Sequence, residues 1–271
     1  MRHVTQATRV VKLGVSCALL TACSVVPLTG RRQLSLIPAS TMMSMSAQEY
    51  GQFLQKHPVS QDAKSTAMVV KVGAGIQHAV ERYFAEKNLA SRLSGYKWEF
   101  NLVESKDPNA WCMPGGKVVV YTGILPLTQD ETGLAVVLGH EIAHAVAEHG
   151  SERMSQGMLA EFGGAALSEA LKEKPEATRA VWMSAFGVGA QYGALLPFSR
   201  LQETEADRLG LIFMAMAGYD PRVAVDFWQR MSAAGGNAPP EFMSTHPSDD
   251  TRMRKIREQL PEALQYYHPG R

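Results

Sequence analysis

The apolar positions of the chain follow helical spacing over long stretches. Between about Ser60 and Glu86 the apolar side chains recur every three or four residues, which is the period of a helix that turns one face toward a core. That face is formed by Val69, Val72, Ile76, Val80, Tyr83 and Phe84. Ser46 is a suitable N-terminal cap for a shorter helix that reaches about Gln55. A last helix is predicted to hold Arg252, Arg254, Lys255 and Arg257.

Three short stretches have the character of β-strands instead. Residues 97–103 alternate between polar and apolar side chains, and residues 110–113 and 117–121 are two further runs. Pro114-Gly115-Gly116 separates these two runs and is a strong turn sequence. We therefore predict a small sheet directly before the next helix.

That helix is predicted from Thr128 to Gly150, where the side chains are apolar or small on nearly every side, so we expect it to be buried all round. Thr128 and Glu131 have the spacing of a capping box, and Gly150 is a typical stop signal. The helix nevertheless contains His140-Glu141-Ile142-Ala143-His144. Two histidines and a glutamate in a buried helix need polar or charged partners that compensate for the loss of water.

The motif is HExxH, and its spacing suits a metal ion. At about 100° per residue, His140 and His144 lie about 40° apart and one turn removed, so both rings can reach one ion. Glu141 lies about 60° to one side of His144, where it can hold a water without being a ligand. The alternative is a pair of structural histidines, but the mid-helix position and the small apolar flanks favour a metal site. His149 lies about 140° around the helix from His144 and is excluded from the site.

A third ligand follows downstream. A catalytic zinc site has three protein ligands and one open position, and two histidines with a glutamate are a standard set. Glu203 and Asp207 stand one turn apart on a predicted helix and share a face, whereas Glu205 points elsewhere. We assign Glu203 as the third ligand and Asp207 as the carboxylate that accepts the free ring N–H of a ligating histidine. The alternative is that these acids are surface partners of Arg200 and Arg208.

Together with Ser-Arg-x-x-Glu-x-Glu-Ala-Asp-x-x-Gly at residues 199–210, the HExxH helix resembles the metallopeptidase family that includes the CAAX prenyl endopeptidases, the HtpX heat-shock protease and mitochondrial OMA. Within that family the chain is most similar to the periplasmic outer-membrane lipoprotein members of Gram-negative bacteria. The similarity runs from about Leu28 to Arg257 and includes residues 29–34, 109–110, 114–116, 217–221 and 244–248. The resemblance implies a zinc ion held by His140, His144 and Glu203, with Glu141 as general base.

The predicted fold class is α+β, a mainly helical, zincin-type (gluzincin-like) metallopeptidase with a small β-sheet beside the HExxH helix. A chain of 271 residues can bury one good core. We expect a signal peptide over residues 1–22, a tether over residues 23–45 and one zinc metallopeptidase domain over residues 46–271. In related zinc peptidases an edge strand at this place pairs with the extended substrate. The candidate substrate-binding residues are therefore Ala110, Trp111, Cys112 and Met113, with a plain structural hairpin as the alternative.

The net charge and the cysteines limit which partners the chain is expected to bind. The formal net charge of +1 and the lack of a basic run argue against a nucleic acid partner. Three basic residues precede a short apolar run ending in Leu20-Thr21-Ala22-Cys23, which resembles a bacterial lipobox. This predicts a signal peptide and a lipid on Cys23 that binds the membrane, with an ordinary signal peptide as the alternative. Ser24 resembles the default sorting signal, so we expect a lipoprotein on the outer membrane that faces the periplasm. Cys112, the remaining thiol, is interpreted as a small buried hydrophobe.

Residues 180–199 carry no charged side chain. Glycines and polar residues dilute their apolar character, so we expect a buried helix or a membrane-facing flap over the cleft. A membrane span is the alternative.

The predicted activity is that of a zinc-dependent endopeptidase. Zinc would activate a water, and Glu141 would take its proton and pass it to the leaving amine. His246 is a candidate regulatory ligand and, with Arg200, a candidate oxyanion donor; an ordinary loop histidine is the alternative. The resemblance implies unfolded or misassembled cell-envelope proteins as substrates and outer-membrane assembly machinery as a candidate partner. The alternative function is a chaperone-like, non-catalytic factor that binds nascent outer-membrane proteins.

Overall fold

A computed structural model describes residues 23–174, 176–191, 196–234, 246 and 250–269, so the predicted signal peptide lies outside the described residues. The fold is mainly helical with small sheets, which confirms the predicted class. The described elements are β1 (Cys23–Val25), β2 (Arg32–Leu34), α2 (Ala39–Lys56), α3 (Ala63–Glu86), β3 (Glu99–Val103), β4 (Ala110–Met113), β5 (Lys117–Tyr121), α4 (Leu125–Thr128), α5 (Glu131–Val146), α6 (His149–Ala170), α7 (Glu176–Ala190), α8 (Leu196–Met216), α9 (Val223–Ala234) and α11 (Asp250–Ala263), with short 3-10 turns at Ala90–Leu93, Thr122–Ile124 and Leu264–Tyr266.

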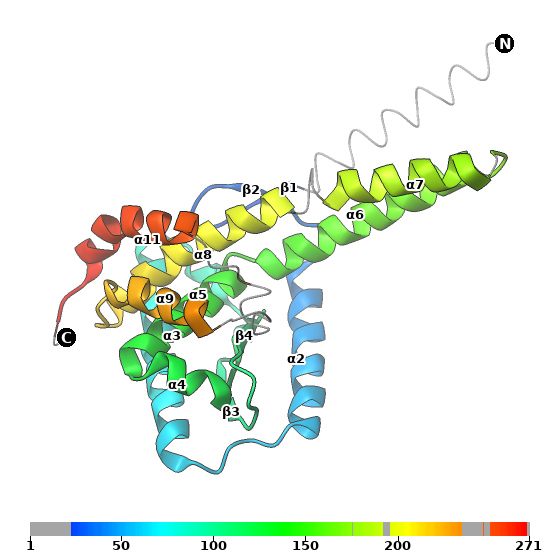
Figure 1. The fold of residues 1–271 in the computed structure, drawn as a ribbon. Coiled ribbons are helices and arrows are strands. Elements are labelled where there is room, and N and C mark those ends of the chain that lie inside the picture. The colour runs from blue at the N-terminus through cyan, green and yellow to red at the C-terminus, as the bar shows by residue number, and fades with distance from the viewer. Residues whose placement is uncertain (1–22, 175, 192–195, 235–245, 247–249, 270–271) are drawn as a thin grey trace.

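Helix α5 is the centre of the core. Every residue of α5 from Gly133 onward is buried, as the all-round apolar pattern predicted. Two glycines bring α5 and α8 together: a Cβ added to Gly139 would lie 2.8 Å from the carbonyl oxygen of Gly210. Since no side chain separates the two backbones at this point, the HExxH helix and the helix that carries Glu203 are held in direct contact (Figure 1).

The ends of α5 differ from the prediction. The capping box at Thr128 is wrong, because Asp130 is the N-cap and its side chain accepts from the Gly133 amide at 2.9 Å. The Thr128 hydroxyl instead donates to the Leu125 carbonyl. The predicted stop at Gly150 is also wrong: α5 ends at Val146, and Gly150 is the second residue of α6. Glu148 makes the break, because its φ of 61° places it in the left-handed region.

The three-stranded sheet has the order β3-β5-β4, with β3 parallel and β4 antiparallel to β5. The predicted limits of β4 and β5 are confirmed, whereas β3 begins at Glu99 and not at residue 97. One face of the sheet packs on the main core, and α2 covers the other, where Tyr50 and Phe53 contact the ring of Trp111 edge-on. Among the described residues, the outer side of β4 pairs with no strand.

The N-terminal part is more regular than a tether. Strands β1 and β2 form an antiparallel pair, and α2 begins at Ala39 and not at Ser46. Helix α3 begins at Ala63, where the Asp62 side chain caps the first turn by accepting from two backbone amides. The segment before residue 46 therefore belongs structurally to the folded body.

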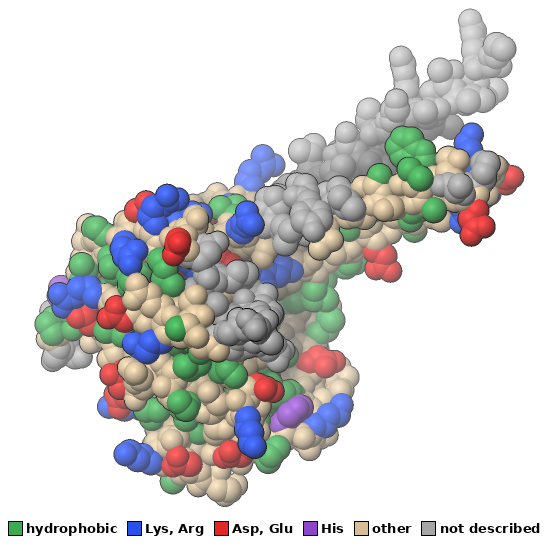
Figure 2. Space-filling model, viewed as in Figure 1, with side chains coloured by type: hydrophobic (Ala, Val, Ile, Leu, Met, Phe, Trp, Pro, Cys, Tyr) green, Lys and Arg blue, Asp and Glu red, His purple; other side chains and the backbone are tan. Residues whose placement is uncertain are grey.

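Helices α6 and α7 lie side by side and project from the body (Figure 1). Figure 2 shows apolar side chains along this pair, and the most exposed are Phe162 at 74%, Val181 at 67% and Trp182 at 56%. The expectation of a buried helix is therefore wrong for α7. Within the described part of the chain, no helix has both the length and the apolar character needed to cross a membrane.

Candidate metal centre

Four buried side chains converge where α5 contacts α8. They are His140, His144, Glu203 and His246, and one donor atom from each lies within 4.8 Å of all the others. His140 Nε2 lies 3.1 Å from His144 Nε2. The Glu203 carboxylate completes the group: its Oε2 lies 3.3 Å from His140 Nε2, and its Oε1 lies 3.3 Å from His144 Nε2. The structure thus brings together the three predicted ligands and His246.

The spacing of these atoms fits a zinc ion. Tetrahedral zinc with ligand distances of about 2.0–2.1 Å separates neighbouring donors by about 3.3 Å. The two ring nitrogens of His140 and His144 are 3.1 Å apart, and each lies 3.3 Å from one oxygen of the Glu203 carboxylate. Buried polar groups need partners, and a bound cation would satisfy both ring nitrogens and the carboxylate at once. The donor set therefore fits the metal that the motif predicted.

His246 occupies a fourth donor position. Its Nδ1 lies 3.0 Å from His140 Nε2 and 2.8 Å from a Glu203 oxygen. Its Nε2 lies 3.5 Å from a Glu141 oxygen. His246 thus lies between the ligands and the predicted general base, as a regulatory ligand or an oxyanion donor must.

The pKa shifts of Glu203 and His144 support their assignment as zinc ligands. Burial alone would raise the pKa of Glu203, but the facing rings of His144, His140 and His246 hold it far below its usual range. Burial lowers the pKa of His144 well below its ordinary value. Glu203 is therefore anionic and His144 neutral, and these are the forms that bind zinc.

Glu141 faces the same space but is not one of the four donors. Burial, with the charge of Glu203, raises the pKa of Glu141 to about 7, although His246 lowers it. Among the described residues, one Glu141 oxygen is buried without a hydrogen-bond partner. The adjacent Cys112 is half-buried, and burial followed by the charge of Glu141 raises the pKa of its thiol. That shift suits a packing role for Cys112, because a raised pKa disfavours the thiolate.

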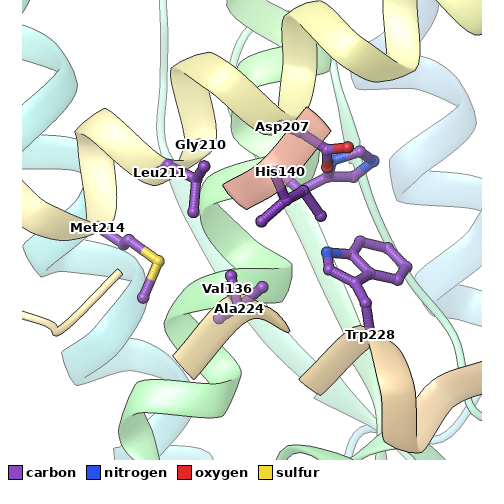
Figure 3. A pocket seen from close by; sticks show the side chains of 9 residues that line it. Val136, His140, Asp207, Gly210, Leu211, Met214, Ala224 and Trp228 are labelled. Atoms are coloured by element: carbon purple, nitrogen blue, oxygen red, sulfur yellow. The ribbon is translucent and has the colours of Figure 1, made fainter. Parts of the chain in front are cut away.

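Asp207 lies at the outer side of His140, where its carboxylate is 2.9 Å from His140 Nδ1. Arg252 on α11 donates two hydrogen bonds to Asp207, at 2.7 and 2.8 Å, and its guanidinium stacks 3.5 Å from the Trp228 ring centre. Figure 3 shows His140, Asp207 and Trp228 together. The cavity there has a volume of about 10 Å³, the lower limit for one water, so it is no substrate pocket.

Two arginines that the sequence pattern did not single out reach the site. Arg153 donates to a Glu203 oxygen at 3.0 Å, and Arg252 lies 3.7 Å from the other. The side chain of Arg200, in contrast, is exposed, and within the described residues it forms no ion pair with the cluster. Only the helix break after α5 and the docking of α11 place Arg153 and Arg252, and neither is visible as spacing in the sequence.

His149 stays outside the donor cluster, as predicted, but the helical-wheel reason for its exclusion is wrong. It is not among the four donors, but its Nδ1 lies 2.8 Å from the Nδ1 of His144. The helical-wheel argument assumed one helix through residue 150. Because α5 ends before Glu148, the chain turns and the His149 ring lies against the outer side of His144. Glu205 also lies in this network, 3.0 Å from His149 Nε2.

Comparison with known proteins identifies the family. Residues 71–260 match peptidase family M48. The chain belongs to this family. It is 43% identical over 175 residues to the mitochondrial metalloendopeptidase OMA1 of Schizosaccharomyces pombe, covering 64% of this chain and 50% of the relative. It is 33% identical over 252 residues to the mitochondrial metalloendopeptidase OMA1 of Bos taurus, covering 90% and 47%. It is 31% identical over 169 residues to the beta-barrel assembly-enhancing protease of Yersinia pestis, covering 59% and 34%.

The family membership confirms the predicted family, the metallopeptidase class and the zinc cofactor. The chain spans about half the length, or less, of these relatives. The predicted location on the outer membrane is wrong, because relatives in Schizosaccharomyces pombe, Arabidopsis thaliana and Bos taurus are named as mitochondrial proteins. A four-residue pattern at Cys23 is too short to determine a location, and the lipid on Cys23 stays a prediction.

Proposed function

We propose that this protein is a zinc-dependent endopeptidase that cleaves unfolded or misassembled proteins. The observation that carries this proposal is the convergence of the buried donor atoms of His140, His144 and Glu203, with the Glu141 carboxylate beside them. Zinc, when bound, supplies Lewis acidity that polarises the scissile carbonyl and acidifies water. The names of the relatives, metalloendopeptidase and assembly-enhancing protease, support the same reaction and a role in protein assembly.

Glu141 acts as the general base in this proposal. Its Oε1, which lies 3.5 Å from His246 Nε2, accepts a proton from water while the water oxygen bonds to the carbonyl carbon. The protonated Glu141 then gives that proton to the amide nitrogen as the C–N bond breaks. A pure binding module needs no buried carboxylate at this place, which is why we favour the enzyme over the chaperone-like alternative.

The outer edge of β4, which pairs with no strand among the described residues, supports an extended substrate. The Tyr121 amide donates to the Asn109 carbonyl at 3.0 Å, so Asn109 is paired toward β5. In an antiparallel pair this orientation alternates, and the peptide groups of Ala110 and Cys112 therefore point away from β5. The Ala110 amide is bonded to the Asn109 side chain. Within the part of the chain that the structure describes, the Ala110 carbonyl and both Cys112 backbone groups are then left for a partner strand.

An extended substrate strand pairs with such an edge through its own backbone. Backbone pairing selects an extended conformation and not a particular sequence, because every residue except proline has the same backbone N–H and C=O groups. Only an unfolded or locally open chain can lie extended along β4. The proposed preference for unfolded and misassembled proteins follows from this geometry.

The first test is metal-dependent cleavage. We expect the full chain to cut a reduced, unfolded protein, to lose this activity in a zinc chelator, and to regain it when zinc is restored. Fragments are followed by gel electrophoresis and mass spectrometry, and client binding by co-sedimentation under the same conditions. Binding without fragments in a zinc-loaded wild type and in His246→Ala would favour the chaperone-like alternative. Cleavage by His246→Ala alone would show that His246 closes the site.

The second test probes the β4 edge. In Cys112→Pro the outward amide is removed, and proline is tolerated where an edge-strand amide faces outward. We expect the KM for an unfolded protein to rise about tenfold above that of Cys112→Ala, since one hydrogen bond contributes about 1 kcal/mol or slightly more. Cys112→Ala loses the thiol but keeps the amide, and thermal unfolding of both variants checks the fold. Equal KM values would exclude pairing at Cys112.

A further inference from the structure

The outer side of His144 is bonded differently from that of His140. His140 Nδ1 faces a carboxylate directly, whereas His144 Nδ1 faces the ring of His149, and only the far nitrogen of His149 reaches a carboxylate, Glu205. His144, His149 and Glu205 are all buried. A second histidine is thus inserted between a proposed ligand and its carboxylate.

The geometry determines where the protons lie. His144 Nε2 is a donor atom of the proposed zinc site, so its ring hydrogen must be on Nδ1. Two ring nitrogens 2.8 Å apart share one hydrogen, so His144 Nδ1 donates and His149 Nδ1 accepts. The hydrogen of His149 is then on Nε2 and is donated to Glu205 at 3.0 Å. One tautomer of each ring satisfies every contact.

The carboxylate at the end of this relay is held by the N-terminal segment. The Thr29 hydroxyl donates to one Glu205 oxygen, and Arg31 Nε donates to the other at 2.7 Å. The terminal nitrogens of Arg31 also bind both oxygens of Glu152 on α6, at 2.9 and 2.7 Å. Paired, planar contacts of this kind are strong and directional.

We propose that Thr29 and Arg31, acting through Glu205 and His149, position His144 for zinc. This inference rests on the proposed function. Arg31 lies well before residue 71, where the match to the family begins, so part of the support of the metal site comes from outside the matched region. Groups that orient a ligating histidine set its tautomer and its ring angle, and their loss weakens metal binding by about 10- to 100-fold.

Arg31→Met and Arg32→Met form a matched pair that tests the segment. Both remove one positive charge at neighbouring positions, but the Arg32 side chain is exposed and only its backbone carbonyl contacts Arg31. We expect Arg31→Met to release zinc to a chelator about 10- to 100-fold faster than wild type, and Arg32→Met to release it at the wild-type rate. Equal rates in the two variants would overturn the inference.

The role of His149 is tested with one polar and one apolar replacement. In His149→Gln the side-chain oxygen accepts from His144 and the amide donates to Glu205, whereas His149→Phe can do neither. We expect fast zinc release and an altered visible spectrum of the cobalt-substituted protein for His149→Phe, and rescue of both properties in His149→Gln. A purely structural role would lower the thermal stability of the metal-free protein and leave zinc release unchanged, which would contradict the proposal.

These measurements do not depend on cleavage. If the zinc-loaded wild type and its His246→Ala variant both cut nothing, the proposed function is refuted and the positioning test can still be made. A zinc-binding wild type whose Arg31→Met variant keeps zinc equally well refutes the positioning role alone. A wild type that binds no zinc refutes both.

Discussion

Glu141→Gln is expected to keep its zinc and lose cleavage. Glutamine has the same shape but cannot accept the proton of the attacking water, and general base catalysis contributes about 10²- to 10⁴-fold. We therefore expect kcat/KM for an unfolded protein to fall by at least this factor. Since Glu141 is not one of the four converging donors, the zinc content should stay at one ion per chain.

The measurement is a paired one. Cleavage rates and zinc content by atomic emission are determined on the same preparations of wild type and Glu141→Gln. Binding of the unfolded protein to the variant should persist, which separates loss of chemistry from loss of substrate contact. Full cleavage by Glu141→Gln would remove Glu141 from the mechanism and revive the search for another base.

Glu203→Ala is expected to lose both zinc and activity. The substitution removes the anionic donor, whose oxygens lie 3.3 Å from the ring nitrogens of His140 and His144. It also leaves the Arg153 and Arg252 guanidinium groups beside the site without the carboxylate they face. The loss of zinc affinity should exceed the 10- to 100-fold that outer contacts contribute.

Thermal unfolding with and without zinc checks this prediction. A ligand at 1,000 times its Kd stabilises the folded state by about 4 kcal/mol. Wild type should therefore gain a large zinc-dependent increase in Tm, and Glu203→Ala should gain almost none. The metal-free forms serve as the internal control for the fold. Full zinc occupancy in purified Glu203→Ala would refute the ligand assignment.

The local spacing of residues in the sequence was enough to predict several elements and most of the proposed zinc ligands. The HExxH spacing places His140 and His144 on one face of a helix, and the same rule places Glu203 and Asp207 together on another. Two short runs separated by a Pro-Gly-Gly turn predicted the limits of β4 and β5. These inferences succeed because each depends on the geometry of one continuous element, which the neighbouring residues dictate.

Tertiary structure decided what lies between the elements. The left-handed Glu148 ends α5 and returns His149 to His144, although spacing along one helix would separate them. Arg31 and Glu205 are 174 positions apart and still share a hydrogen bond. Arg252, and not Arg200, reaches the buried site because α11 packs against α8. The spacing of residues along one helix cannot predict contacts between separate elements. Such contacts depend on which helices can pack closely, and Gly139 and Gly210 allow α5 and α8 to do so.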